Sequence, residues 1–216
     1  MPAPAACLFD LDGLLLDTEP LQAKAWRQTA ARFGSDLSAE RLLQLRGRRR
    51  LDCAAQVLAW IGADGGACGS REELLALREP IAARLLSQAP AMAGAEHLVR
   101  RCHALQLPMA LATSSSRQAV DLKVAPHPWL ALIEERVHGD DPGLAAGKPA
   151  PDVFLLAAER LGVAAAQCWA FEDSPVGAAA AVAAGCHVHV VLCPDTRQAV
   201  FPEGVTLLDS LEQVHL

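Results

Sequence analysis

Two pairs of acidic residues follow directly on apolar segments, where water is scarce once a chain folds. Asp10 and Asp12 follow the apolar run Leu8-Phe9, and Glu172 and Asp173 follow a second apolar run. An isolated buried carboxylate loses several kcal/mol of hydration free energy unless a cation or hydrogen-bond donors compensate it. These acids therefore need a physical reason to be there, and the rest of the chain indicates what it is.

Three interpretations of the first pair follow from the residues alone. A turn accounts for Gly13 but not for two acids in so apolar a segment. An EF-hand calcium loop fails, because Leu14 occupies a ligand position and Leu15 the glycine position. The third interpretation is an acid pair that binds magnesium and carries out chemistry. In the second pair, helix capping explains Asp173 more easily than Glu172.

Two further segments carry groups that suit an anion. Thr113–Ser116 follow the apolar segment Met109–Ala112 and precede a predicted helix, so their hydroxyl and backbone N–H groups favour phosphate, with simple N-capping as the alternative. Lys148 lies between Gly147 and Pro149. Because proline disfavours a helical conformation in the residue before it, Lys148 can project into a cleft, although a lone lysine is ordinarily a solvated surface charge.

The order of the segments predicts an α/β protein. Helical periodicity fills the chain from Thr18 to about Leu86, and short apolar strands alternate with helices thereafter. Such alternation indicates a parallel sheet with helices on both faces. We therefore expect an α/β core with a Rossmann-like parallel sheet at residues 1–16 and 89–216, and an all-helical cap inserted at residues 17–88. Ligands of such sheets bind at the carboxyl ends of the strands, where the polar residues lie.

The expected elements have definite bounds. The strands are predicted at residues 5–9, 109–112, 136–137, 168–171 and 187–192. The helices of the inserted block are predicted from Thr18, from Ser38, at 51–61 with Gly62 as the stop, and at 71–86 with a kink or break at Pro80. The later helices are predicted at 96–105, 117–124, 153–161 and 176–184.

Composition limits the classes of function. Of the 216 residues, 52% are hydrophobic and 20% charged, which indicates a globular chain, and the net charge of −6 argues against a nucleic-acid binder or a polybasic membrane-surface protein. We expect no signal peptide, no membrane span, a cytoplasmic location and a monomer. The cysteines lack a C-x-x-C pair, which predicts reduced thiols and not a disulfide framework or a zinc site. They are Cys7, Cys53, Cys68, Cys102, Cys168, Cys186 and Cys193.

Four segments together resemble the signature of one enzyme family. Their order along the chain is similar to that of the haloacid dehalogenase-like hydrolases, in the branch with a helical cap after the first strand. The resemblance covers essentially the whole chain, and residues 139–142 and 147–154 are similar in particular to phosphatases of sugar, polyol and pseudouridine phosphates. The segments are Asp10-Leu11-Asp12-Gly13, Thr113, Gly147-Lys148-Pro149 and Glu172-Asp173-Ser174.

The resemblance implies a mechanism and a role for each residue. Asp10 is implied as the nucleophile that forms an aspartyl-phosphate, and Asp12 as the general acid and then the general base. Thr113 and the Ser114 backbone amide are implied to hold the phosphoryl oxygens, and Lys148 to offset their negative charge. Because dehalogenases of this family lack an acid at the place of Asp12, the acid here points to phosphate esters.

The same resemblance implies a magnesium ion. A ligand set of oxygens with room for phosphate and water suits Mg²⁺. The implied ligands are the Asp10 carboxylate, the Asp12 backbone carbonyl, Asp173, and Glu172 directly or through water.

The cap is expected to choose the substrate, a small phosphorylated metabolite such as a sugar, polyol or nucleoside monophosphate. In related enzymes a cap loop lowers a basic residue onto the substrate. The stretch Arg46–Arg50 matches that loop, and Arg50 is the residue that we expect to contact substrate. A solvated helix start and a nucleic-acid patch are the alternatives for these arginines.

Two rival functions stay open at this point. A β-phosphoglucomutase-like enzyme transfers the phosphoryl group between sugar hydroxyls, and such mutases carry a histidine in the first cap helix. Gln22 stands at that place and cannot relay a proton, so hydrolysis is preferred. The second rival is a non-catalytic phosphate-binding module on the same fold. All the catalytic positions are filled, which argues against it.

Overall fold

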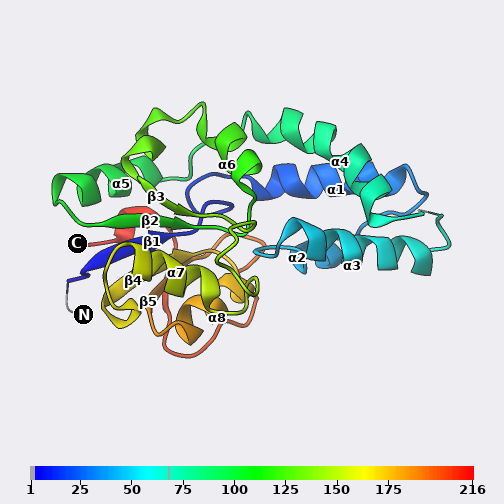
Figure 1. Cartoon of the computed structure of the whole chain (residues 1–216). Helices are drawn as coiled ribbons and strands as arrows, with labels where there is room; N and C mark the ends of the chain where they lie inside the picture. Colours follow the sequence, from blue (N-terminus) through cyan, green and yellow to red (C-terminus); the bar gives the residue numbers. More distant parts are fainter. Residues whose placement is uncertain (1–2, 68) are drawn as a thin grey trace.

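Six parallel strands form a sheet in the larger part of the molecule (Figure 1). The structure, a computed structural model, describes residues 3–67 and 69–216. The strand order is β3-β2-β1-β4-β5-β6, so the first strand lies inside the sheet and later strands extend it in both directions. The strands are β1 (Ala6–Phe9), β2 (Met109–Ala112), β3 (Glu135–Val137), β4 (Cys168–Glu172), β5 (His187–Val191) and β6 (Thr206–Leu208).

Helices cover both faces of the sheet, because successive side chains of each strand enter opposite apolar layers. On β1, Cys7 and Phe9 belong to one layer and Ala6 and Leu8 to the other. In Figure 1 the helices of the first layer lie above the sheet and those of the second below it. The first layer holds α5 (Ala95–Ala104), α6 (Arg117–Val124), η1 (Pro128–Leu132) and η3 (Leu211–Gln213), and the second holds α7 (Asp152–Arg160), η2 (Ala165–Gln167) and α8 (Pro175–Ala183).

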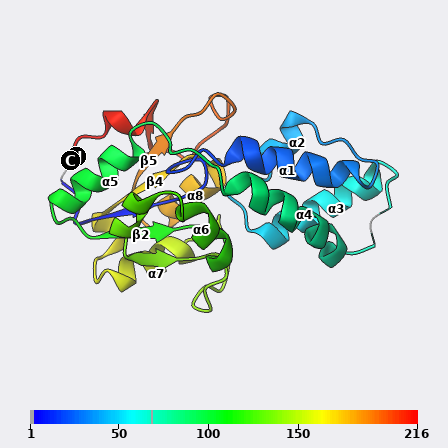
Figure 2. The same cartoon turned by 90° about the horizontal axis from the view of Figure 1, so that it is seen from above.

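Between β1 and β2 the chain forms a helix bundle to one side of the sheet, as both views show (Figures 1 and 2). The bundle has its own apolar core, in which Trp26, Val57, Ile61 and Leu74 are buried. Its two connections to the sheet run side by side, with the Asp17 backbone N–H donating to the Pro90 carbonyl at 2.8 Å. The bundle consists of α1 (Glu19–Ala31), α2 (Ala39–Leu43), α3 (Arg50–Ala63) and α4 (Arg71–Leu86).

The α/β fold class predicted from the sequence is confirmed, and the five predicted strands form within one residue of their expected ends. Two details of the bundle differ from the prediction. α3 continues through Gly62 to Ala63, and α4 is unbroken at Pro80. Burial of Leu74 and Leu75 before Pro80, and of Ala82 and Leu86 after it, anchors both halves of α4. Tertiary packing therefore overrides the local preference of each residue.

Three further observations concern strand β6, the cysteines and the helix lengths. Strand β6 was not predicted, because its three residues are half-buried or exposed and carry no continuous apolar signal. The six cysteines among the described residues have free thiols, and Cys68 lies outside those residues. Among the described residues no helix combines the length and the apolar character that a membrane crossing requires.

The central strands predict where the fold is most sensitive to substitution. Phe9 is fully buried, and its ring stacks on that of Phe171 at a centroid distance of 5.0 Å. Phe9→Ala is expected to lower the free energy of unfolding by about 3–5 kcal/mol, because it leaves a cavity between two layers. Urea denaturation followed by circular dichroism measures the loss. Leu207→Ala on the edge strand, where the side chain is 52% exposed, is the control and should cost under about 0.5 kcal/mol. Equal losses in the two variants would contradict the prediction.

Candidate active site

A cavity of about 440 Å³ lies between the carboxyl edge of the sheet and the helix bundle. The segments that follow β1 and β2 contribute Asp10, Asp12, Thr113 and Ser114 to its lining, and the bundle contributes Arg50 among others. This volume is ordinary for a small-molecule site. The strand ends singled out in the sequence therefore border a space in which a metabolite fits.

Lys148 joins two of the predicted acids at this edge. Its Nζ lies 2.6 Å from Asp10 Oδ1 and 2.5 Å from Glu172 Oε1, and all three side chains are buried. Burial alone lowers the pKa of Lys148, but the two carboxylates outweigh it and the pKa is raised. Burial raises the pKa of Asp10 to about 7, although Lys148 acts to lower it. One lysine therefore offsets the negative charge of two acids only in part.

Asp10, Glu172 and Asp173 form the group best suited to hold a cation. Their carboxylate oxygens lie within 4.8 Å of one another, and all three residues are buried. Gly13, with a φ of 86°, packs so closely on this group that a Cβ would come within 2.2 Å of Asp173 Oδ2. An all-oxygen donor set with surplus negative charge fits a hard divalent cation such as Mg²⁺. The residues present therefore fit the magnesium site implied by the resemblance.

Asp12 points to a different set of partners from those of Asp10. Its Oδ1 accepts from Thr18 Oγ1 at 2.7 Å, and its Oδ2 accepts from Ser115 Oγ at 2.7 Å and from Lys123 Nζ at 2.5 Å. Burial acts to raise the pKa of Asp12, but Lys123 and the two hydroxyls outweigh it and lower that pKa. Two acids two positions apart on one loop thus have opposite electrostatic environments.

The segment after β2 offers hydroxyl and amide groups at the beginning of α6. Thr113 is buried, and its Oγ1 accepts from the Ser115 backbone N–H at 3.1 Å. Ser116 caps the helix, because its Oγ accepts from the Ala119 N–H at 3.4 Å. N-capping thus accounts for Ser116 alone, and Thr113 and Ser114 remain at the cavity. Ser114 Oγ donates to the Gly47 carbonyl of the bundle at 2.8 Å.

The loop between α2 and α3 (residues 44–49) closes the bundle onto the sheet. Arg46 Nη2 lies 3.0 Å from Asp173 Oδ2, and Arg46 Nε lies 3.5 Å from Glu19 Oε2. Gly47, with a φ of 72°, approaches Ser174 so closely that a Cβ would lie 2.3 Å from its Oγ. Burial acts to lower the pKa of Arg46, but the two acids outweigh it and raise that pKa. The loop therefore brings a buried cation to the acidic group at the sheet edge.

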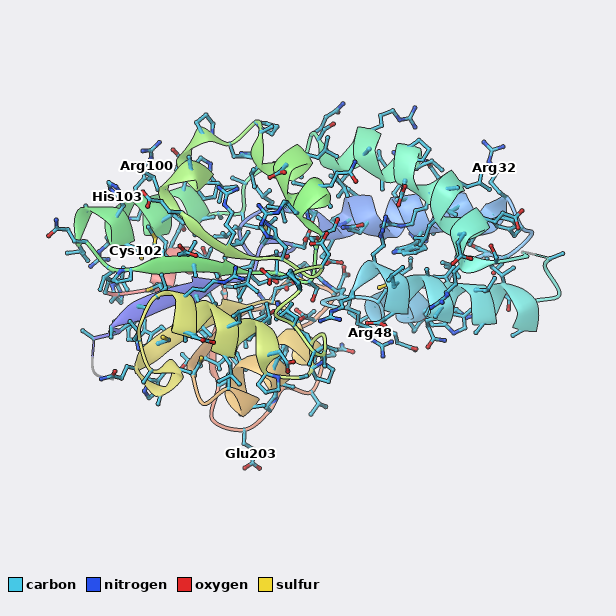
Figure 3. The ribbon with its side chains drawn as sticks, viewed as in Figure 1. Arg32, Arg48, Arg100, Cys102, His103 and Glu203 are labelled. Carbon is cyan, nitrogen blue, oxygen red and sulfur yellow. The ribbon has the colours of Figure 1, made fainter. Side chains whose placement is uncertain are left out.

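Arg50, the arginine expected to contact substrate, lies at the cavity with its guanidinium paired to Glu79. Its side chain is 43% exposed, so it can move within solvent. The contact between Arg50 and substrate stays a prediction. In the same cluster, Arg46 is buried against Asp173, whereas Arg48 is exposed and lies beside the junction of the bundle and the sheet (Figure 3).

Sequence reasoning missed three charged residues of the site. Lys123, Glu19 and Arg46 each contact a predicted acid or its partner, and none was assigned a role. Burial raises the pKa of Glu19 to about 7, although Arg46 acts to lower it. A signal was present, because the number of acids at the strand ends exceeds what Lys148 alone can offset. Which basic residues supply the remainder depends on tertiary placement.

The chain has relatives among known proteins. A family model described as haloacid dehalogenase-like hydrolase matches residues 4–185. "Probable pseudouridine-5'-phosphatase" of Drosophila melanogaster is 39% identical over 88% of this chain and 82% of that protein. "(DL)-glycerol-3-phosphatase 2" of Arabidopsis thaliana is 35% identical over 92% of this chain and 82% of that protein. The crystal structure of CbbY from Rhodobacter sphaeroides in complex with phosphate has a TM-score of 0.83 and 26% identity, and covers 97% of this chain and 96% of that one.

The raised pKa values of Asp10 and Glu19 predict how the stability of the protein depends on pH. In the metal-free protein the pKa values of Asp10 and Glu19 are each about 7, against about 4 for an unfolded chain. Between pH 4 and 7 the folded state then binds more protons than the unfolded state, so its stability falls as pH rises. In EDTA, the Tm of wild type should fall between pH 5 and 8, and the Tm of Glu19→Gln should fall by at least about 3 °C less, as measured by calorimetry.

Magnesium provides the matching control for this prediction. Mg²⁺ favours the ionised acids, so the wild-type gain in Tm on adding Mg²⁺ should be larger at pH 8 than at pH 5. Asp173→Asn should abolish most of that gain. If the Tm in EDTA falls by the same amount in wild type and in Glu19→Gln, the raised pKa of Glu19 is contradicted.

Proposed function

The chain belongs to the haloacid dehalogenase-like hydrolases, and on that premise we propose that it is a Mg²⁺-dependent phosphatase of a small phosphorylated metabolite. One observation carries the proposal. Asp10 and Asp12 border the same cavity, yet Asp10 belongs to the acidic group with Lys148 while Asp12 is held by Thr18, Ser115 and Lys123. Such a separation suits two different roles in one reaction.

In the first step Asp10 acts as the nucleophile. A bond forms between its carboxylate oxygen and phosphorus, and the bond between phosphorus and the substrate oxygen breaks. Asp12 donates a proton to the departing alcohol, so it must carry a proton when the ester breaks. Mg²⁺, held by Asp10, Glu172, Asp173 and the Asp12 backbone carbonyl, supplies positive charge to the phosphoryl oxygens when it is bound. The product is an aspartyl-phosphate and a free alcohol.

In the second step water hydrolyses the aspartyl-phosphate. Asp12, now a carboxylate, accepts a proton from water, the water oxygen attacks phosphorus, and the carboxylate of Asp10 is released. The contacts that lower the pKa of Asp12 favour its carboxylate form, which this step uses, whereas the first step uses the protonated form, which the negative charge of a bound phosphate ester favours. Lys148, beside Asp10, offsets the charge that the leaving carboxylate regains.

The remaining contacts assign substrate binding to both parts of the molecule. Thr113 and the Ser114 backbone amide bind the phosphoryl oxygens, as hydroxyl and amide donors at a helix beginning do. The bundle, residues 17–88, acts as a cap that encloses the alcohol part of the substrate. Arg50 reaches the substrate once its contact with Glu79 breaks.

Water is the proposed acceptor, and not a second sugar hydroxyl. Gln22 lines the cavity, and its Oε1 accepts from Arg78 Nη2. An amide held in this way has no titratable proton to relay between hydroxyls. The names of the relatives favour the same reaction, because they are phosphatases of a nucleoside and a polyol phosphate. We assign this chain to the same broad class of substrates.

Loss of the nucleophile tests the reaction directly. The wild-type protein is expected to release inorganic phosphate from p-nitrophenyl phosphate and from one or more of pseudouridine 5'-phosphate, glycerol 3-phosphate and sorbitol 6-phosphate, with activity lost in EDTA. Asp10→Asn should lower kcat at least about a thousandfold, because no phosphoenzyme can form. The exposed Asp121→Asn is the control and should retain wild-type kcat.

Two outcomes of that experiment would overturn the proposal. Isomerised hexose phosphate without free phosphate, formed from a hexose 1-phosphate and a bisphosphate primer, would establish a mutase. Binding of phosphate esters without turnover of any ester in the presence of Mg²⁺ would establish a non-catalytic binding module.

Lys123 provides a second prediction for the same reaction. Its ammonium group is buried and contacts Asp12 and Ser115, so it orients the carboxylate that handles protons. Lys123→Met should lower kcat about tenfold or more with a smaller change in KM, whereas the exposed Lys24→Met should change neither. If Lys123 acts through Asp12, the Lys123→Met change should have little further effect in an Asp12→Asn background. Fully additive losses, or no rescue by Lys123→Arg, would contradict this positioning role.

A further inference from the structure

Arg78 on α4 is a buried cation that no acid neutralises. Its exposed fraction is 6%, and it lines the same cavity as Asp10 and Asp12. Among the described residues no carboxylate forms an ion pair with it. Burying a charge without a partner costs several kcal/mol of desolvation, and a ligand of opposite charge would offset that cost.

The direct contacts of Arg78 do not supply the missing negative charge. Its guanidinium lies 4.0 Å from the centre of the Trp26 ring, and Nη2 donates to the neutral Gln22. Its Nε is buried and has no hydrogen-bond partner. Burial lowers the pKa of Arg78 to about 10, which still leaves the group charged at neutral pH. A fixed ring on one side and a fixed amide on the other hold the cation in place.

The other arginines near the cavity differ from Arg78 in having an acidic partner, in being exposed or in their position. Arg46 is paired with Asp173 and Glu19, and Arg50 with Glu79. Arg48 also lines the cavity, but its side chain is exposed to solvent. Arg49 has buried nitrogens without a hydrogen-bond partner, but it packs against Gly147 and is not among the residues that line the cavity. Arg78 is therefore the buried arginine at this cavity whose charge is left for a ligand.

The position of Arg78 matches the alcohol end of a bound ester. One face of α4, which includes Arg78, Glu79, Ala82 and Leu86, forms part of the bundle side of the cavity, and Asp10 lies on the sheet side. An ester whose phosphorus is at Asp10 extends its alcohol part toward this face. Glu79 is paired with Arg50, and Arg48 on this side is exposed. Among the described residues that line this side, Arg78 is therefore the buried cation that keeps a donor without a partner.

We infer that Arg78 binds a second oxyanion, carried by the alcohol part of the substrate as a carboxylate or a second phosphate. This inference rests on the proposed function, which it narrows to phosphorylated sugar acids or sugar bisphosphates. A planar guanidinium forms paired hydrogen bonds with either oxyanion, and neutral hydroxyl groups do not offset its charge. Gln22 and Trp26 hold Arg78 in position for that contact.

Matched esters test the inference because they differ in one group. 6-Phosphogluconate and sorbitol 6-phosphate differ only in a terminal carboxylate or hydroxymethyl group, and 3-phosphoglycerate and glycerol 3-phosphate form a shorter pair. Fructose 1,6-bisphosphate against fructose 6-phosphate tests a second phosphate. For each ester kcat/KM is measured, together with the inhibition constant against hydrolysis of p-nitrophenyl phosphate. The wild-type enzyme should favour the anionic member of one or more pairs tenfold or more by one of these measures.

Variants of Arg78 then test whether this residue is responsible for the preference for anionic esters. Arg78→Met should reduce the ratio of anionic to neutral ester at least tenfold, and Arg78→Lys should restore part of it. Arg84→Met removes an exposed charge from the same helix and should leave the ratio unchanged. Since Arg78→Met removes an unpaired buried charge, its Tm should be equal to or above that of wild type.

The outcomes separate this inference from the proposed function. Turnover of esters without preference for the anionic member, or an equal loss on both members in Arg78→Met, would overturn the inference and leave the phosphatase in place. A Tm that falls in Arg78→Met without a change in the ratio would make Arg78 a structural partner of Trp26. Without hydrolysis of any ester the proposed function fails, and the shift in Tm with 6-phosphogluconate against sorbitol 6-phosphate still decides whether the oxyanion is bound.

Discussion

An excess of carboxylates at the carboxyl edge of the sheet is the constraint on which the arrangement of the site depends. Each acid alone is costly to remove from water, and together they repel one another. The fold places basic side chains among them, and the remaining excess suits a divalent cation. The acids are Asp10, Asp12, Glu19, Glu172 and Asp173, and the basic residues are Lys123, Lys148 and Arg46.

Charge compensation also explains why distant segments must meet at this edge. Lys148 is 138 residues from Asp10 in the chain, and Arg46 is 127 residues from Asp173. A parallel sheet brings several strand ends to one edge, so the acids at the ends of β1 and β4 gather there by topology, and Glu19 joins them from the beginning of α1. The basic residues come from α6, from the segment before α7 and from the α2–α3 loop of the bundle. The loop contact that joins the bundle to the sheet therefore also places Arg46 beside Asp173, and Gly47 permits the close approach.

The fold and the acids of the site could be predicted from sequence because their signals are local. A short apolar strand that ends in an acid predicts both the strand and the place of the acid, as at Phe9 and Asp10. Strand β6 gave no such signal because it is half-exposed at the edge of the sheet. Lys123 could not be assigned, since a lysine on an amphipathic helix looks solvent-exposed until α6 is placed over Asp12. Among the clustered arginines, the fold alone determines that Arg46 is buried and Arg48 exposed.

Arg78 shows the same constraint with its sign reversed. At the sheet edge the fold buries acids and supplies too few cations, and a metal ion suits the remainder. On the bundle side it buries Arg78, with which no acid among the described residues forms an ion pair, so the ligand that completes the balance is negative. A substrate with phosphate at one end and a second oxyanion at the other would meet both imbalances at once. Its binding would then neutralise each half of the cavity, and the free protein would lose stability by keeping Arg78 unpaired. The electrostatics of the two halves thus link the chemistry of Asp10 to the choice of substrate by Arg78.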